Sequence, residues 1–135
     1  GSFALWKYLK EVCNTDIEWT YDDIDYVVNT EEQGNQLLNF FRQTGEPETV
    51  LYEGIYKFNK AQVNIKLYED IRFRLHVHDI DVCQVGTDNK NFYLSKSAYN
   101  SIQNNQCKVT GLTFDQQRTN QRIQKYTKRG FVLQP

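Results

Sequence analysis

The chain of 135 residues is 39% hydrophobic and 14% aromatic, and its formal net charge is -1. This composition supplies enough apolar side chains for one hydrophobic core and excludes a chain that is disordered throughout. No apolar run approaches the ~20 residues that a membrane-spanning helix needs, so the sequence predicts no membrane segment.

A single domain is predicted over residues 3–135, because no Pro/Gly/Ser-rich linker divides the chain. Gly1 and Ser2 have the form of a tag-cleavage scar, and the chain contains no methionine. Both features indicate a part of a longer protein. The three cysteines are widely spaced, which disfavours a disulfide framework or a zinc site built on cysteine pairs. We therefore expect an intracellular protein, with the nucleus as one candidate compartment.

Three helices are predicted near the N-terminus. Apolar residues at helical spacing predict the first over residues 3–13. Thr20, followed by several acids, has the form of a helix N-cap and first turn, which predicts the second over residues 20–29. A capping-box sequence at Thr30–Gln33 predicts the third over residues 30–43.

The hydrophobic pattern then changes from helical spacing to alternation. Alternating runs predict strands over residues 50–58, 63–67 and 71–77, with a turn at Asn59-Lys60, and a shorter strand over residues 92–94. This is the pattern of a central antiparallel strand meander with one dry and one wet face.

Two helices are predicted near the C-terminus. Ser95 is suited to cap a helix over residues 95–104, and Thr113 is suited to cap a longer one. Gly130 lies just past the end of the longer helix, where a backbone with positive φ is often required. Residues 131–133 are predicted to return as a strand.

These elements predict an α+β fold with N-terminal helices, a central antiparallel strand meander and a C-terminal helix pair. The helix–turn–helix–strand order of residues 95–133 resembles a winged helix, and residues 1–60 resemble one more loosely, with three helices before a hairpin. The resemblance lies in the order of helices and strands, and no sequence motif supports it. It implies that the last helix is a recognition helix.

Charge is distributed unevenly along the chain. Residues 108–135 contain six Lys or Arg and one Asp, whereas residues 1–60 contain five Lys or Arg and eleven Asp or Glu. Four of the C-terminal bases recur at i, i+4, i+7 and i+11, and they therefore share one face of the last helix. Such asymmetry is typical of a face that binds a polyanion, or of an acidic and a basic half that match each other.

The basic and amide side chains of this helix are the candidate nucleic-acid-binding residues: Gln117, Arg118, Asn120, Gln121, Arg122, Lys125, Lys128 and Arg129. Arg and Lys contact phosphates, while Asn and Gln read base edges. Ile123 and Tyr126 are expected to anchor the helix. We predict a non-enzymatic module that binds nucleic acid, DNA in particular, in a salt-sensitive manner. Two alternatives remain open: the helix is simply solvated, or its bases pair with the acidic half.

Two other functions are compatible with the sequence. One is a protein-interaction domain within a chromatin or nucleic-acid-processing complex. It would bind a basic partner through the acidic helices, or a peptide along an exposed sheet edge. The other is a small metal-dependent enzyme that uses His76 and His78, which a strand over residues 71–77 would bring to one face. No cofactor is assigned, because the sequence contains neither a nucleophile elbow nor a phosphate-binding glycine loop.

Overall fold

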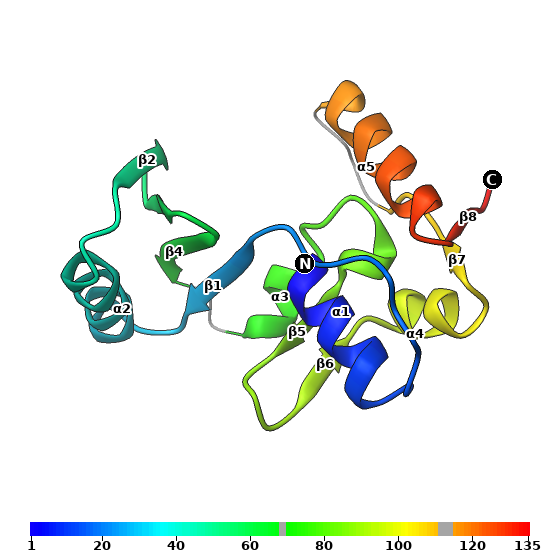
Figure 1. The fold of residues 1–135 in the computed structure, drawn as a ribbon, viewed down its shortest axis with the longest axis horizontal. Helices are drawn as coiled ribbons and strands as arrows, with labels where there is room; N and C mark the ends of the chain where they lie inside the picture. Colours follow the sequence, from blue (N-terminus) through cyan, green and yellow to red (C-terminus); the bar gives the residue numbers. More distant parts are fainter. Residues whose placement is uncertain (68–69, 111–114) are drawn as a thin grey trace.

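The computed structural model describes residues 1–67, 70–110 and 115–135, and its fold is mixed α+β (Figure 1). The helices are α1 (Ser2–Glu11), α2 (Glu31–Gln43), α3 (Ile71–Leu75), α4 (Lys96–Gln103) and α5 (Gln116–Lys128), and Asp81–Cys83 forms a single 3-10 turn. The strands are β1 (Ile24–Val28), β2 (Glu48–Tyr52), β3 (Ile55–Phe58), β4 (Ala61–Leu67), β5 (Val85–Thr87), β6 (Phe92–Leu94), β7 (Gln106–Cys107) and β8 (Val132–Leu133).

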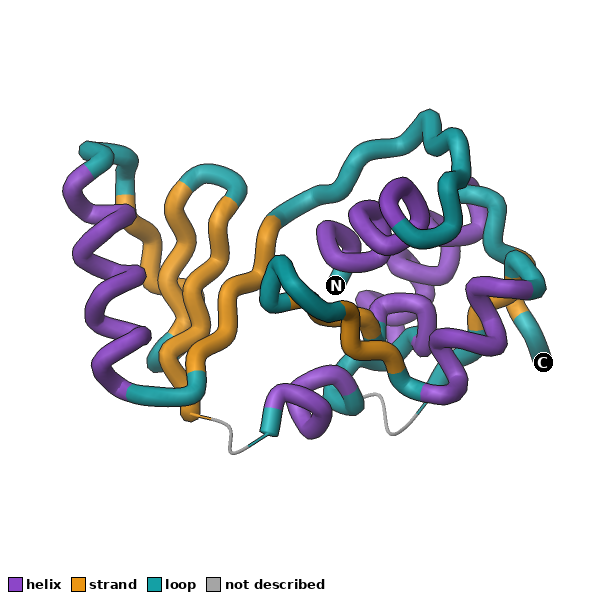
Figure 2. Tube along the Cα trace, turned by 90° about the horizontal axis from the view of Figure 1, so that it is seen from below, coloured by secondary structure: helices purple, strands orange, loops and turns teal. Residues whose placement is uncertain are grey.

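Residues 24–67 form what we call the sheet lobe. Its four strands lie in the order β1-β4-β3-β2, with β1 parallel to β4 and the other neighbours antiparallel. Helix α2 runs alongside this sheet (Figure 2). Leu38 of α2 packs with Phe58 and Val63 in a small core of their own, and the rings of Phe41 and Phe58 stack at 5.3 Å.

The remaining elements, α1 with those of residues 71–110 and 115–135, form the helical lobe. Its core is a second cluster, whose fully buried members include Leu5, Ile80, Val82, Val85, Ala98 and Cys107. Strands β5 and β6 pair antiparallel, whereas β8 pairs parallel with β7. The chain therefore comes back from the end of α5 to lie beside the segment that leaves α4 (Figure 1).

The buried Asp81 ties α4 to the segment that leads to α5. Its Oδ2 accepts hydrogen bonds from the hydroxyls of Ser97 (2.6 Å) and Ser101 (2.5 Å), and its Oδ1 accepts one from the backbone N–H of Lys108 (2.9 Å). An unpaired buried carboxylate would be strongly destabilising, so these three donors explain how the helical lobe accommodates it.

The helix expected over residues 20–29 is wrong, because residues 24–28 form β1. Four residues of this strand are β-branched or aromatic, which favours an extended backbone: Ile24, Tyr26, Val27 and Val28. The acids beside the strand, which suggested a helix first turn, instead form ion pairs with distant bases. The three-helix order expected for residues 1–60 is therefore wrong, and β1 makes the central sheet mixed instead of purely antiparallel.

The strand expected over residues 71–77 is also wrong, because Ile71–Leu75 forms the short helix α3. The carboxylate of Asp70 accepts a hydrogen bond from the backbone N–H of Arg72 (2.9 Å) and so caps this helix. Leu75 is buried, whereas Phe73 and Val77 are exposed. The alternation of this run therefore does not reflect one dry face, since a period of two cannot distinguish a strand from a single helical turn.

The strand expected over residues 50–58 is interrupted at Gly54. This glycine has a φ of +80°, which side chains rarely adopt, and it closes a tight hairpin between β2 and β3. The turn expected at Asn59-Lys60 is present between β3 and β4. The chain therefore makes one more turn in this region than the alternation of apolar residues predicts.

Several local predictions are confirmed. Thr30 and Ser95 cap α2 and α4 through their side-chain oxygens, and Gly130 has a φ of +101° just past α5. The strand after Gly130 is present as β8. The cap expected at Thr113 lies outside the described residues; α5 begins at Gln116, and its N-terminus is capped by Asp115.

Candidate nucleic-acid interface

One side of α5 is buried against the helical lobe. Thr119 and Tyr126 are almost fully buried, and Ile123 packs against the same core. The ring of Tyr126 also lies 6.2 Å from that of Phe131, centroid to centroid. The anchoring role expected for Ile123 and Tyr126 is therefore confirmed, and the helix is fixed along one edge.

Arg122 points toward a carboxylate that is largely shielded from solvent. Its Nη1 lies 2.9 Å from Oδ1 of Asp79, whose other oxygen accepts a hydrogen bond of 2.5 Å from the Thr119 hydroxyl. The Asp79 side chain is only 13% exposed. This pair joins α5 to the segment after α3, so Arg122 serves to hold the helix in place.

Lys125 and Arg129 share a second carboxylate, that of Asp22 in the segment before β1. The Nζ of Lys125 lies 2.7 Å from Oδ2 of Asp22, and the Nη2 of Arg129 lies 3.3 Å from Oδ1. Burial alone would raise the pKa of Asp22, but hydrogen bonds and positive charge from the two bases outweigh it, so the pKa is lowered. Unlike Asp79, the Asp22 side chain is 48% exposed.

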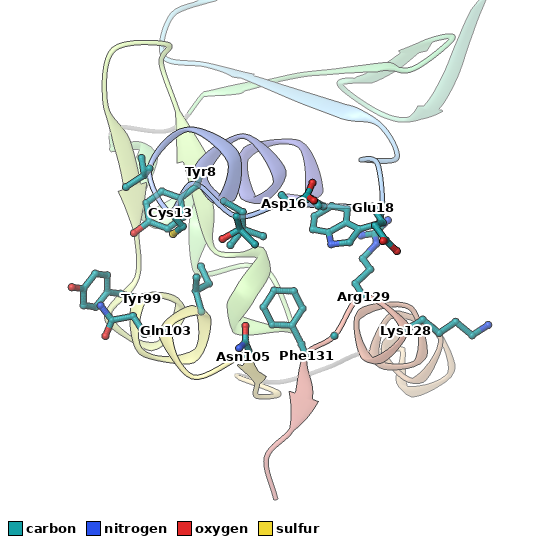
Figure 3. Close-up of a pocket in the computed structure, with 17 residues that line it drawn as sticks. Tyr8, Cys13, Asp16, Glu18, Tyr99, Gln103, Asn105, Lys128, Arg129 and Phe131 are labelled. Carbon is teal, nitrogen blue, oxygen red and sulfur yellow. The ribbon is translucent and has the colours of Figure 1, made fainter.

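The guanidinium of Arg129 is also held by aromatic rings. It lies 4.4 Å from the ring of Trp19 and 5.0 Å from that of Tyr126. Its buried Nη1 has no hydrogen-bond partner, and these two ring faces supply the electrostatic contact in its place. Figure 3 shows Arg129 rising from the end of α5 toward the segment that carries Glu18, at the wall of a cavity of about 1150 Å³.

The opposite side of α5 carries a polar stripe that faces solvent. Gln117, Gln121, Gln124 and Lys128 recur at i, i+4, i+7 and i+11, and all four are exposed. Arg118 is exposed beside this stripe, and Lys128 points away from the cavity (Figure 3). Asn120 is exposed too, although its Oδ1 accepts a hydrogen bond from Gln116. We call Gln117, Arg118, Asn120, Gln121, Gln124 and Lys128 the free face of α5.

The eight residues predicted from the sequence thus divide into two sets. Arg122, Lys125 and Arg129 make intramolecular ion pairs, whereas the other five lie on the free face. Within the described part of the chain, the side chains of Arg118 and Lys128 have no ionic partner. Gln124 joins the free face although it was not among the candidates; its spacing from Gln117 and Gln121 is the signal that identifies it.

His76 and His78 do not form the metal site expected from a strand over residues 71–77. His76 follows α3 and is exposed, whereas His78 lies further along the same turn. Burial lowers the pKa of His78 well below its usual 6.5, and nearby arginines add to the effect. Among residues 1–67, 70–110 and 115–135, no three His, Cys, Asp or Glu side chains are grouped as metal ligands would be.

Comparisons with protein-family models, with curated proteins and with solved structures returned no match. Every helix in the described part of the chain is too short or too polar to cross a bilayer. The function is therefore inferred from the geometry of the molecule alone.

Proposed function

We propose that the protein is a non-enzymatic nucleic-acid-binding module of a larger intracellular protein, with DNA as its preferred ligand. The free face of α5 carries the proposal, because it combines amide side chains with two bases that form no ion pair with the described residues, along an anchored helix. Gln and Asn amides suit base edges, and Arg118 and Lys128 suit phosphates.

The ion pairs on the other edge of α5 support this role. A recognition helix must be held rigidly so that its side chains meet the groove without loss of conformational freedom. Arg122 on Asp79, and Arg129 between two aromatic rings, restrain α5 at two points along its length. The free face is thereby preorganised for contact with a ligand.

The order of α4, α5 and β8 is that of a winged helix, but two features depart from that fold. The connection from Asn104 to Asp115 is longer than the three or four residues of a compact helix–turn–helix. Strand β8 pairs with β7 in that connection and not with a following strand. We propose that α5 enters the groove as the recognition helix.

Two unpaired bases imply weak binding with a shallow salt dependence. With about two phosphate contacts, the slope of log K against log salt concentration is expected near -2. Affinities for nonspecific duplex are expected in the range of about 1 to 100 µM near physiological salt. The net charge of -1 offers no long-range attraction that would raise this affinity.

Fluorescence anisotropy with labelled duplex and single-stranded DNA tests this proposal. The variant that carries both Arg118→Glu and Lys128→Glu should lose at least about tenfold in affinity, because two phosphate contacts become repulsive. The control carries Lys66→Glu and Lys90→Glu, which change the net charge equally at exposed sites outside α5. Loss of affinity in the control alone, or in neither variant, would refute the proposed interface.

A second candidate function, peptide binding, is favoured by the outer edge of the sheet. Among the described strands, β2 pairs only with β3, and all five of its residues are exposed. Val50 and Tyr52 are among the most exposed apolar side chains. An extended peptide can add to such an edge by backbone hydrogen bonds. The acidic α2, with exposed Glu31 and Glu32, would favour a basic peptide.

The second candidate is tested by recovery of partners from a lysate with and without nuclease. A single basic protein that remains bound after nuclease treatment, and that Thr49→Pro releases, would favour it over nucleic-acid binding. The Arg118→Glu and Lys128→Glu variant serves as the control, because it should leave capture at β2 unchanged.

A further inference from the structure

We propose that Lys125 and Arg129 form a phosphate subsite for the nucleic-acid backbone, and that the Asp22 carboxylate occupies this subsite in the free protein. The inference rests on the proposed function, since it adds a second contact region to the same helix. The subsite lies beside the free face of α5. In the free protein the oxygens of Asp22 occupy the positions that phosphate oxygens would occupy in the complex.

The contacts of Asp22 are those that a phosphate would receive. One oxygen lies 2.7 Å from the ammonium of Lys125, and both oxygens lie within 3.4 Å of Nη2 of Arg129. An ammonium and a guanidinium around one anion are the donors that proteins commonly use for phosphate groups. Lys125 and Arg129 are one helical turn apart, next to the stripe of the free face, so one backbone strand could reach both regions.

The exposure of Asp22 makes its carboxylate replaceable. The pair of Asp22 with Lys125 is exposed on both sides, at 48% and 40%, and such a pair contributes at most about 1 kcal/mol. The Arg129 side chain is only 8% exposed, so it relies on its ring contacts and on the Thr20 carbonyl once Asp22 has moved. The backbone of Asp22 is fixed separately, since its N–H donates to the Ser2 hydroxyl at 3.1 Å. A rotation of the side chain alone is therefore enough to vacate the subsite.

Arg129 would remain in position after Asp22 has moved. Its guanidinium stays against Trp19 and Tyr126, and its Nη2 also donates to the backbone carbonyl of Thr20 at 3.3 Å. The donors that face Asp22 are thus preorganised for another anion. Asp79 differs because its own side chain is only 13% exposed and also accepts a hydrogen bond from the buried Thr119, and we assign the pair of Asp79 and Arg122 no part in ligand binding.

The test is the affinity of Asp22→Asn for a labelled DNA duplex. This substitution keeps the side-chain shape and removes the competing charge, so affinity should rise about tenfold at about 50 mM salt, with a salt slope steeper by one to two. Glu18→Gln is the matched control, because it removes one charge from the same segment. Glu18 is exposed and makes no ion pair in the described residues. Adding Lys125→Gln to Asp22→Asn should remove the gain.

The outcomes separate this inference from the proposed function. If the wild type binds and Asp22→Asn binds no better than Glu18→Gln, the subsite is refuted and the free face stands. A gain that survives Lys125→Gln also refutes the subsite, because the double variant lacks the Lys125 ammonium and has the same net charge as the wild type. If neither the wild type nor Asp22→Asn binds, both proposals fail.

Discussion

At the residue scale, burial decides what each acidic partner of α5 can do. Asp79 and Asp22 both accept from bases of this helix, but their side chains are 13% and 48% exposed. A buried carboxylate that loses its partner cannot turn to water, whereas a half-exposed one can. Asp79 is therefore a structural partner, and Asp22 is a replaceable one.

Substitution of the two carboxylates should separate these roles. We expect Asp79→Asn to lower the free energy of unfolding by about 2 to 3 kcal/mol, because Arg122 loses its buried countercharge. Asp22→Asn should lower it less, by about 1 kcal/mol, because Lys125 can turn to water and Arg129 keeps its ring contacts. Urea denaturation followed by circular dichroism measures both values. Equal losses in the two variants would contradict the distinction.

His78 should make stability depend on pH. Burial lowers its pKa well below 6.5, so the unfolded chain binds a proton more readily than the folded one. The contribution of neutral His78 is therefore complete above about pH 6.5 and is lost as the pH falls below that value. His78→Gln should flatten the decline in unfolding free energy between about pH 7 and pH 5. His76→Gln, at an exposed site two residues away, should retain it.

At the element scale, the N-cap of α5 sets the start of the interface. The Asp115 carboxylate accepts a hydrogen bond from the backbone N–H of Arg118 at 3.0 Å. Asp115→Ala should lower the free energy of unfolding by about 1 kcal/mol, because a helix N-terminus loses its acceptor. Asp115→Asn keeps an acceptor and should cost much less, which thermal or urea denaturation can resolve. Equal losses would show that charge and not capping stabilises this end.

Caps and turns could be predicted from sequence because their partners lie within a few residues. Thr30, Ser95 and Gly130 are of this kind, and the structure confirms all three. The strand β1 could not be predicted, because its partner β4 lies beyond an intervening helix and hairpin. The acidic residues near β1 resemble the first turn of a helix. The pairing of β1 with β4 outweighs this local preference for a helix.

At the scale of the whole molecule, the contacts of the interface also depend on residues far apart in the sequence, and sequence patterns do not reveal such contacts. The sequence shows an acidic N-terminal part and a basic C-terminal part, and it places the bases of α5 on a helix. It does not show that Asp22 reaches Lys125, since 103 positions separate them. The structure answers the alternative left open by the charge pattern: part of the basic helix pairs with the chain's own acids, and part of it is exposed.

The two hydrophobic clusters predict an uneven response to mutation. Phe58 is almost fully buried in the sheet lobe, so Phe58→Ala should destabilise that lobe by about 3 to 5 kcal/mol. Trp6 and Trp19 report on the helical lobe, where the indole N–H of Trp6 donates to the carbonyl of Trp19. Far-UV circular dichroism should then change at lower urea than tryptophan fluorescence. Coincident transitions would instead support the single cooperative domain predicted from the sequence.

The most direct test of nucleic-acid binding by α5 is a titration of the protein with a short DNA duplex, followed by backbone amide NMR chemical shifts. The proposed function predicts that the largest changes fall on residues 117–128, centred on Gln117, Gln121, Gln124 and Lys128, with smaller changes at Asp22 as its side chain is displaced. Changes confined to β2 and its neighbours, or no change at low salt, would contradict the proposal that α5 is the nucleic-acid interface.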